Sequence, residues 1–134
     1  MKDIEREILG KLNNFFLSDL LEESEYEYNR YDAENNHYIV EIKHRTNHYK
    51  NTMIEFDKFS YNLLYAEMNN KKFIYAVQMI DKIYVFNITS LMLKDYFFNW
   101  EWRLMPKQTE HKDKRLIKKL VGYINISKRV KEID

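Results

Sequence analysis

The stretch Tyr38-Ile-Val-Glu-Ile-Lys-His44 decides the fold expected for this chain of 134 residues. Its β-branched residues favour a strand, and successive side chains of a strand project to opposite faces. Glu41 and Lys43 therefore lie side by side on one face, while the neighbouring aliphatic residues project from the other face into a core. The stretch predicts a core strand that holds two charged groups next to each other.

An aromatic stretch before this strand predicts its partner in a β-hairpin. Residues 25–31 alternate polar with aromatic side chains, and the Asn35-Asn36 pair that follows them tolerates the positive φ of a tight turn. A turn centred on this pair places Asp32 opposite Ile39 and diagonal to Glu41. At that spacing the two carboxylates could share one cation.

The rest of the chain predicts helices and buried strands around the hairpin. Apolar residues recur at three- and four-residue spacing in three segments, which predicts amphipathic helices over residues 3–21, 53–68 and 113–124. A polar loop is expected at 45–52, and Asn69-Asn70 should end the second helix. Short apolar runs predict two adjacent buried strands at 73–80 and 83–88. A short helix at 90–98 and an edge strand at 100–104, stopped by Pro106, complete the order.

Composition predicts one α/β domain over residues 1–134. The chain holds 2 Gly and 1 Pro but 11 Tyr, 8 Phe and 2 Trp, so core-forming residues are abundant and linker residues are few. No apolar run reaches the roughly 20 residues that cross a bilayer, and the acidic start is unlike a signal peptide. A cytoplasmic protein without membrane contact is expected.

The metal-binding residue types favour a hard ion. The sequence contains no cysteine, which excludes disulfides, thiolate catalysis and Cys-based zinc sites. Its four histidines lack the close paired spacing of a His-only site on a helix. Carboxylates would hold any metal, and carboxylates prefer ions such as Mg²⁺.

Charge is distributed unevenly along the chain, although the formal net charge is +1. Residues 1–34 carry ten acidic and four basic side chains, whereas residues 107–131 carry nine basic and two acidic ones. This basic C-terminal segment would attract a polyanion. The predicted helix at 113–124 presents the candidate nucleic-acid contacts Lys114, Arg115, Lys118 and Lys119. A solvated amphipathic helix is the alternative interpretation.

Asp32, Glu41 and Lys43 together suit the hydrolysis of a phosphodiester. Carboxylates hold Mg²⁺ against a phosphate oxygen, and an ammonium beside them positions or activates the attacking water. Asp32 and Glu41 are therefore the predicted metal ligands, and Lys43 the predicted water-orienting group. The alternative is that Asp32 ends a strand at a turn while Glu41 and Lys43 pair on a solvated sheet face.

The motif Asp32…Glu41-Ile42-Lys43, preceded by helix 3–21 and followed by helix 53–68 and strand 72–80, resembles the α-β-β-α-β core of the PD-(D/E)XK nucleases over about two thirds of the chain. The resemblance implies a restriction-endonuclease-like fold, a mixed central sheet of about four to five strands flanked by helices in the order α-β-β-α-β-β-α. It also implies Mg²⁺-dependent cleavage of DNA or RNA, with Mn²⁺ as a substitute. The sequence departs from the pattern at Tyr31, which stands where the motif has proline.

The resemblance implies three accessory residues. Some relatives add a carboxylate from the first helix, and Glu5 lies in line with the apolar stripe of that helix. A carboxylate stabilised by the helix dipole is the alternative for Glu5. The following helix and the last core strand of such nucleases supply polar residues, here Lys58 and Gln78. A solvated lysine and an exposed glutamine are the alternatives, and helix capping accounts for Glu55.

The function expected from the sequence is a DNA endonuclease that acts as a dimer or higher homo-oligomer, because so small a chain offers little surface for a long duplex. The first alternative is a catalytically inactive nuclease-fold module that binds nucleic acid or a protein partner. A second is an interaction protein with no site. The high Asn and Lys content is typical of AT-rich genomes, such as those of phages or mobile elements.

Overall fold

The central sheet is built around β3 (Tyr38–Arg45), the strand that the sequence predicts. The structure is a computed structural model that describes residues 1–16, 19–25, 30–96, 98–106 and 115–134. The sheet has six strands in the order β1-β2-β3-β5-β6-β9. The other members are β1 (Glu22–Glu23), β2 (Ala33–Glu34), β5 (Lys72–Met79), β6 (Lys82–Asn87) and β9 (Lys131–Ile133). The sheet is mixed, because β3 and β5 are parallel and the other neighbours are antiparallel.

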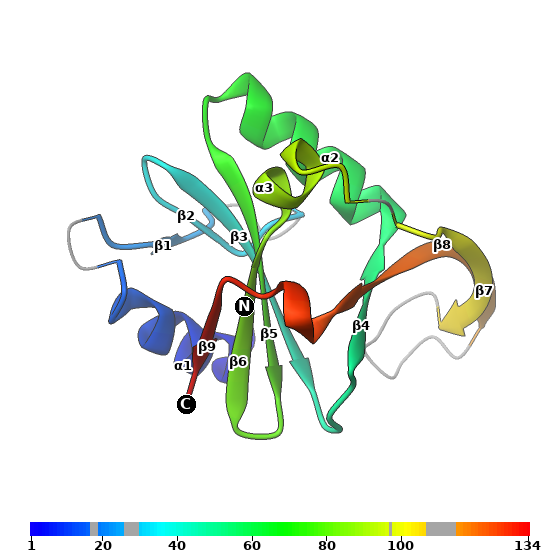
Figure 1. The fold of residues 1–134 in the computed structure, drawn as a ribbon. Helices are drawn as coiled ribbons and strands as arrows, with labels where there is room; N and C mark the ends of the chain where they lie inside the picture. The colour runs from blue at the N-terminus through cyan, green and yellow to red at the C-terminus, as the bar shows by residue number, and fades with distance from the viewer. Residues whose placement is uncertain (17–18, 26–29, 97, 107–114) are drawn as a thin grey trace.

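A crossover connects the two parallel strands, since parallel neighbours cannot be joined by a tight turn. It consists of β4 (Asn51–Glu55) and α2 (Phe56–Met68). In Figure 1, α2 and α3 (Ile88–Leu93) lie at one end of the sheet, whereas α1 (Asp3–Asn13) lies near β1, β2 and β3. The molecule is therefore a mixed α/β fold whose central sheet is flanked by helices.

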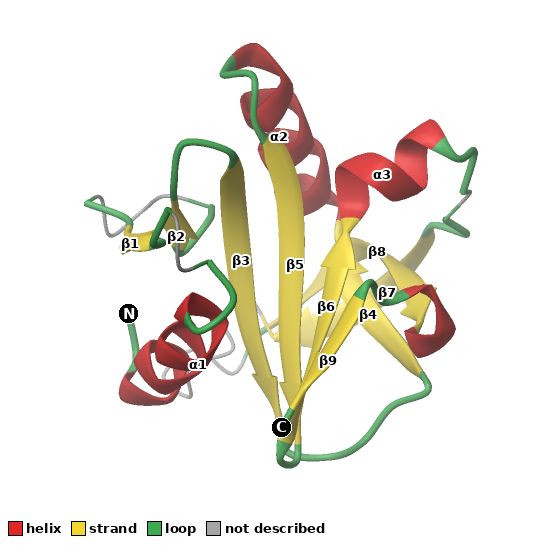
Figure 2. Cartoon of the chain, turned by 60° about the vertical axis from the view of Figure 1, so that its left-hand side comes forward, coloured by secondary structure: helices red, strands yellow, loops and turns green. Residues whose placement is uncertain are grey.

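Two apolar clusters cover the two faces of the central sheet. The first contains Ile39 and Phe73 of the sheet together with Phe59 of α2, and the second contains Val40 and Ile42 together with residues of α1. Because strand side chains alternate, Glu41 and Lys43 project into the first layer, toward α2. Figure 2 shows α1 and α2 as separate helices on different sides of β3.

A second sheet of three strands extends from the crossover, in the order β4-β8-β7. It contains β7 (Glu101–Pro106) and β8 (Leu116–Asn125), and η1 (Ile126–Lys128) leads from β8 to β9. In Figure 1 this sheet lies at the side of the molecule, with β8 next to β4. The predicted edge strand at 100–104 is confirmed over residues 101–104, because β7 is the last strand of this sheet. The predicted stop before Pro106 is wrong, since Pro106 still pairs with Leu116.

The predicted helix over 113–124 is wrong, since residues 116–125 form β8; residues 113 and 114 lie outside the described part. The apolar spacing suits a helix, but β4 and β7 pair with β8 on both sides and satisfy its backbone groups. Gly122 adds a reason: a Cβ there would lie 3.0 Å from Trp100 Cε3, so the bare backbone allows close packing. Pairing partners and close packing outweigh the local helical pattern.

Several predicted boundaries also differ from the structure. The first helix ends at Asn13, whose side chain accepts from the Leu21 N–H (2.8 Å) and donates to the Leu21 carbonyl, so the chain turns back instead of continuing. Residues 53–55 are strand, because β4 pairs with β8. The short helix occupies 88–93 and not 90–98. Of the predicted strand at 25–31, residues 26–29 lie outside the described part, and the described ends are not strand.

The predicted strands at 38–44, 73–80 and 83–88 are confirmed as β3, β5 and β6. The second helix does end at Asn69-Asn70, where Asn70 adopts a positive φ of 55°. Among the described helices, none has the length and apolar character needed to span a membrane.

Candidate active site

Asp32 directly precedes β2, whose register with β3 differs by two residues from the predicted one. Ala33 pairs with Val40 and Glu34 with Ile39, and the Asp32 N–H also donates to the Val40 carbonyl, so Asp32 lies opposite Val40 and not Ile39. The turn is centred on residues 36 and 37, because the Asn35 N–H bonds the Tyr38 carbonyl and the Asn35 side chain accepts from the backbone N–H groups of residues 37 and 38. The charge of Asp32 still acts on Glu41, because it contributes to raising the pKa of that carboxyl.

The Asp32 carboxylate is fixed by the backbone of β3. Its Oδ2 accepts a hydrogen bond from the Ile42 N–H (2.7 Å), and the Asp32 N–H donates to the Val40 carbonyl (2.8 Å). Burial raises the pKa of Asp32, against the lowering effect of the Ile42 bond, and the charge of Glu5 raises it further. The other oxygen of this carboxylate, Oδ1, accepts no hydrogen bond from the described residues.

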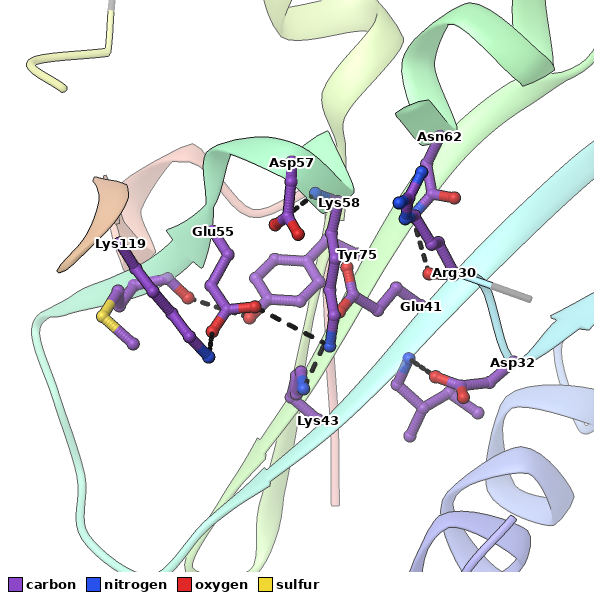
Figure 3. Close-up of polar contacts among 12 residues, drawn as sticks. Arg30, Asp32, Glu41, Lys43, Glu55, Asp57, Lys58, Asn62, Tyr75 and Lys119 are labelled. Atoms are coloured by element: carbon purple, nitrogen blue, oxygen red, sulfur yellow. Dashed lines mark hydrogen bonds and ion pairs between the residues drawn. The ribbon is translucent and has the colours of Figure 1, made fainter. Parts of the chain in front are cut away.

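Glu41 is the buried carboxylate at the centre of the site, with only 3% of its surface exposed. Its Oε1 lies 3.8 Å from Lys43 Nζ and 3.6 Å from Lys58 Nζ, whereas its Oε2 is buried without any hydrogen-bond partner among the residues described. Figure 3 shows Glu41, Lys43 and Lys58 gathered between β3 and the first turn of α2. The predicted proximity of Glu41, Lys43 and Lys58 is present in the structure.

A second carboxylate–lysine pair adjoins this group at the start of α2. Glu55 Oε1 accepts a hydrogen bond from Lys119 Nζ of β8 (2.9 Å), and Glu55 Oε2 lies 3.9 Å from Lys58 Nζ. Glu55 is the N-cap residue of α2, but its side chain makes no capping hydrogen bond. Glu55 therefore serves the charge network, and the capping explanation expected from the sequence is wrong.

Tyr75 of β5 forms the floor beside Glu41, its register partner on β3. The Tyr75 side chain is buried, and its hydroxyl donates to the Met53 carbonyl (2.9 Å). Burial raises the pKa of Tyr75, so the hydroxyl stays protonated. Next to it lies a cavity of about 20 Å³ lined by Glu41, Lys43, Glu55, Lys58, Tyr75 and neighbouring residues. That volume holds one water molecule or one ion.

Burial perturbs the protonation equilibria of Glu41 and of the two lysines beside it. It raises the pKa of Glu41 to about 7, although Lys43 and Lys58 oppose the shift. For Lys43, burial lowers the pKa, and the nearby charge of Lys58 lowers it further. For Lys58, burial opposes protonation, but Glu41, Lys43 and Glu55 outweigh it and raise the pKa. Lys58 is thus the charged partner of Glu41, and Lys43 the lysine that gives up a proton more readily.

The donor set fits a hard cation, although its geometry is not that of a complete metal site. Glu41 Oε2 and the second oxygen of Asp32 are the oxygen donors free to bind an ion. Across the described ranges, no group of three or more His, Asp and Glu side chains is arranged to hold a metal. Protein groups would supply a minority of the ligands, as Mg²⁺ commonly allows, because it retains several waters.

Two of the three predicted accessory residues lie near Glu41 or Asp32, and the third does not. Lys58 reaches the centre directly, and Glu5 lies near enough to raise the pKa of Asp32 while its Oε2 accepts from the Lys2 N–H (3.3 Å). Gln78 does not reach it, because it pairs with His44 and so projects from the face opposite Lys43; its Nε2 donates to the Ile80 carbonyl.

The candidate nucleic-acid contacts do not share one face. Lys118 and Lys119 are neighbours on a strand and so project to opposite sides, and Lys119 is bound to Glu55. Arg115 is exposed just before β8, and Lys114 lies outside the described residues. The basic helical face expected from the sequence is therefore absent from the described part of this segment.

Two residues of the centre were not identified from the sequence. Tyr75 carries a polar hydroxyl inside an apolar strand and pairs in register with Glu41. Only that register, which the sequence does not give, indicates that Tyr75 belongs to the site. Lys119 comes from a segment far away in the chain, and only the pairing of β8 with β4 places it at Glu55.

Comparison with known proteins identifies no relative of this chain. No protein-family model matches the chain, and searches of curated proteins and of solved structures find no significant match.

Proposed function

We propose that this chain is a metal-dependent nuclease of the PD-(D/E)XK type, which hydrolyses phosphodiester bonds with Asp32, Glu41 and Lys43. The observation that carries the proposal is the environment of Glu41. This carboxylate is buried with one oxygen that has no partner among the described residues, and its other oxygen is 3.8 Å from the Lys43 ammonium nitrogen. The charge of Asp32 also acts on it and raises its pKa. Burying a carboxylate with a free oxygen is costly, and a bound cation would remove that cost.

The topology around the site gives the proposal a second support. An antiparallel β1-β2-β3 unit is followed by β5, which is parallel to β3 and connected through α2. This order agrees with the α-β-β-α-β core that the motif implies. The insertion of β4 before α2 and the second sheet are additions to that core.

Each residue of the centre has a role that follows from its contacts. Asp32 and Glu41 would hold Mg²⁺, and the bound ion would stabilise negative charge on the phosphate. Lys43, with its lowered pKa, orients the attacking water and accepts its proton. Lys58 stays protonated and holds Glu41 in place. The tyrosine hydroxyl at residue 75 stays bonded to the Met53 carbonyl and closes the floor.

We further propose DNA as the substrate and a homo-oligomer as the active form, because of the charge distribution and the small size of the chain.

A specific contact favours the alternative of a non-catalytic nuclease-fold module. Lys58 Nζ lies 3.6 Å from Glu41 Oε1, and an ammonium there neutralises Glu41 without a metal.

A cleavage assay separates the two functions. Plasmid, single-stranded DNA, branched DNA and RNA are incubated with the protein and Mg²⁺ or Mn²⁺, with and without EDTA. The nuclease proposal requires metal-dependent cutting that falls at least about 100-fold in Glu41→Gln and in Lys43→Ala. Lys82→Ala, a change at a half-exposed lysine that pairs with Glu132, serves as the control and should cut like the wild type. Binding without cutting on every substrate would favour the non-catalytic module.

A further inference from the structure

A second and larger cavity lies beside the candidate active site. It has a volume of about 220 Å³ and is lined mainly by Arg45, Tyr49, Asn51, Met53, Arg103 and Tyr123. We name it the arginine pocket. Arg45 and Met53 also line the small cavity at Glu41, so the two hollows are neighbours with a shared wall. A group bound in the arginine pocket would therefore lie next to the reacting centre.

The arginine pocket is positively charged. Two guanidinium groups line it, and its lining contains no carboxylate. Arg45 forms no ion pair with a carboxylate in the described part of the chain, and the nearest acidic partner of Arg103 is the exposed Glu101, at 4.0 Å. Arg103 Nη1 donates to the Tyr123 hydroxyl, which holds the guanidinium at the rim. Such a hollow attracts an anion, and guanidinium groups match the geometry of a phosphate.

The remaining walls suit a nucleoside. Tyr49 is 46% exposed and offers a ring face on which a base could stack. The Asn51 side chain is held by a hydrogen bond from Asn125 Nδ2 (3.2 Å), and its own amide group stays available to a base edge. The volume is below the roughly 300–1,000 Å³ of pockets for larger ligands, so it suits one nucleotide and not a stacked pair.

We propose that the arginine pocket binds one unpaired nucleotide of the nucleic acid, next to the phosphodiester held at Glu41. Its phosphate bonds Arg45 and Arg103, and its base packs on Tyr49. The choice of ligand rests on the proposed function, whereas the pocket itself does not. A base can enter the pocket only when it is unstacked, so the pocket selects single-stranded or opened substrates over intact duplex.

The test is binding of a short fluorescein-labelled single-stranded oligodeoxynucleotide and of its duplex, followed by fluorescence anisotropy in EDTA so that no strand is cut. Arg103→Gln should weaken single-strand binding by about ten-fold and reduce the slope of log K against log salt by about 0.7, because one phosphate contact is lost. Tyr49→Ala should weaken binding by about ten-fold without changing the slope, because a stacked base carries no charge. Arg103→Lys should retain the slope.

Matched controls remove the same groups elsewhere. Arg6→Gln and Tyr61→Ala change an arginine of α1 that pairs with Glu23 and an exposed tyrosine of α2, and both should bind like the wild type. Circular dichroism checks that each variant is folded. Because the Arg103 and Tyr49 side chains are partly exposed, replacing them should not prevent folding. The pocket is refuted if Arg103→Gln and Tyr49→Ala bind as tightly as their controls, if duplex binds as well as single strand, or if no oligonucleotide binds.

The assay distinguishes failure of the pocket from failure of the proposed function. If the pocket variants lose single-strand affinity but no substrate is cut with Mg²⁺, the pocket stands and the nuclease proposal fails. If Mg²⁺-dependent cutting is abolished by Glu41→Gln while Arg103→Gln and Tyr49→Ala leave affinity and KM unchanged, the nuclease stands and the pocket proposal fails.

Discussion

Glu41 is the residue at which the fold and the proposed chemistry oppose each other. Its side chain is buried, one of its oxygens has no partner within the described residues, and its nearest charged neighbours are two lysines. Burial favours the neutral acid, whereas metal binding requires the carboxylate. Without metal, Glu41 should therefore be protonated below about pH 7, a higher pH than for an exposed glutamate.

This preference predicts a pH dependence of stability. The pKa of Glu41 rises from its ordinary value of 4.5 to about 7 on folding. The unfolded chain gives up this proton first, so the contribution of Glu41 is fully present below pH 4.5 and is lost as pH rises through 7. Relative to the wild type, Glu41→Gln should gain up to about 3 kcal/mol in the free energy of unfolding over this range.

Urea unfolding without metal at several pH values between 4 and 8 measures the difference. Glu23→Gln removes a carboxylate at an exposed ion pair and is the control, since its curve should follow the wild type within this window. A constant difference between wild type and Glu41→Gln at every pH would contradict the burial argument.

Mg²⁺ should reverse this effect, because binding requires the ionised carboxylate. At about 100 times its Kd, a ligand specific for the folded state stabilises by about 2.7 kcal/mol, which is roughly 10 °C in Tm for a domain of this size. The rise should be larger at pH 8 than at pH 5 and absent in Glu41→Gln. Differential scanning fluorimetry with Mg²⁺, and with Na⁺ at equal ionic strength, measures it. An equal rise in Glu41→Gln would place the metal elsewhere.

At the scale of elements, β8 depends on tight packing at Gly122. A Cβ at this position would lie 3.0 Å from two ring atoms of Trp100 and 3.1 Å from Phe98 Cδ1. Gly122→Ala should therefore lower the free energy of unfolding by about 1–3 kcal/mol through overpacking. Gly10→Ala is the matched control, because Gly10 lies in α1 with nothing within 4 Å of the added Cβ.

In the control, alanine is the better helix former and should stabilise by roughly 0.5–1 kcal/mol. If β8 is a strand packed on Trp100, denaturant unfolding should show that the free energy of unfolding falls in Gly122→Ala and rises in Gly10→Ala. A helix over 113–124, as the sequence alone suggested, would make Gly122→Ala stabilising as well, and equal signs would therefore argue against β8.

The elements differ in how far the sequence determined them. β3, β5 and β6 are short, apolar and rich in β-branched or aromatic residues, so local preference and burial favour the same structure. The hairpin turn was placed one residue too early, because the Asn35 side chain caps the turn and does not lie at its centre. β8 was missed because its apolar spacing also fits a helix.

At the scale of the whole molecule, stability should be greatest where the two core layers share a strand. Every residue of β5 from 73 to 79 is buried, and β5 lies between β3 and β6. β7, in contrast, is an edge strand with mostly exposed side chains. Hydrogen exchange followed by mass spectrometry should show the slowest exchange in β5 and much faster exchange in β7. Comparable protection of the two strands would contradict this division.

The sequence by itself determined the central strands, the mixed α/β class, and the adjacency of Glu41 and Lys43, because alternation along one strand is a local property. Only the tertiary structure decided that the backbone of β3 holds Asp32, that Lys58 and Glu55 join Glu41, and that Lys119 and Tyr75 complete the surroundings. These neighbours come from separate segments of the chain, so strand register and strand pairing decide whether they meet. Register and pairing depend on the free energy of the whole folded chain and not on any one segment.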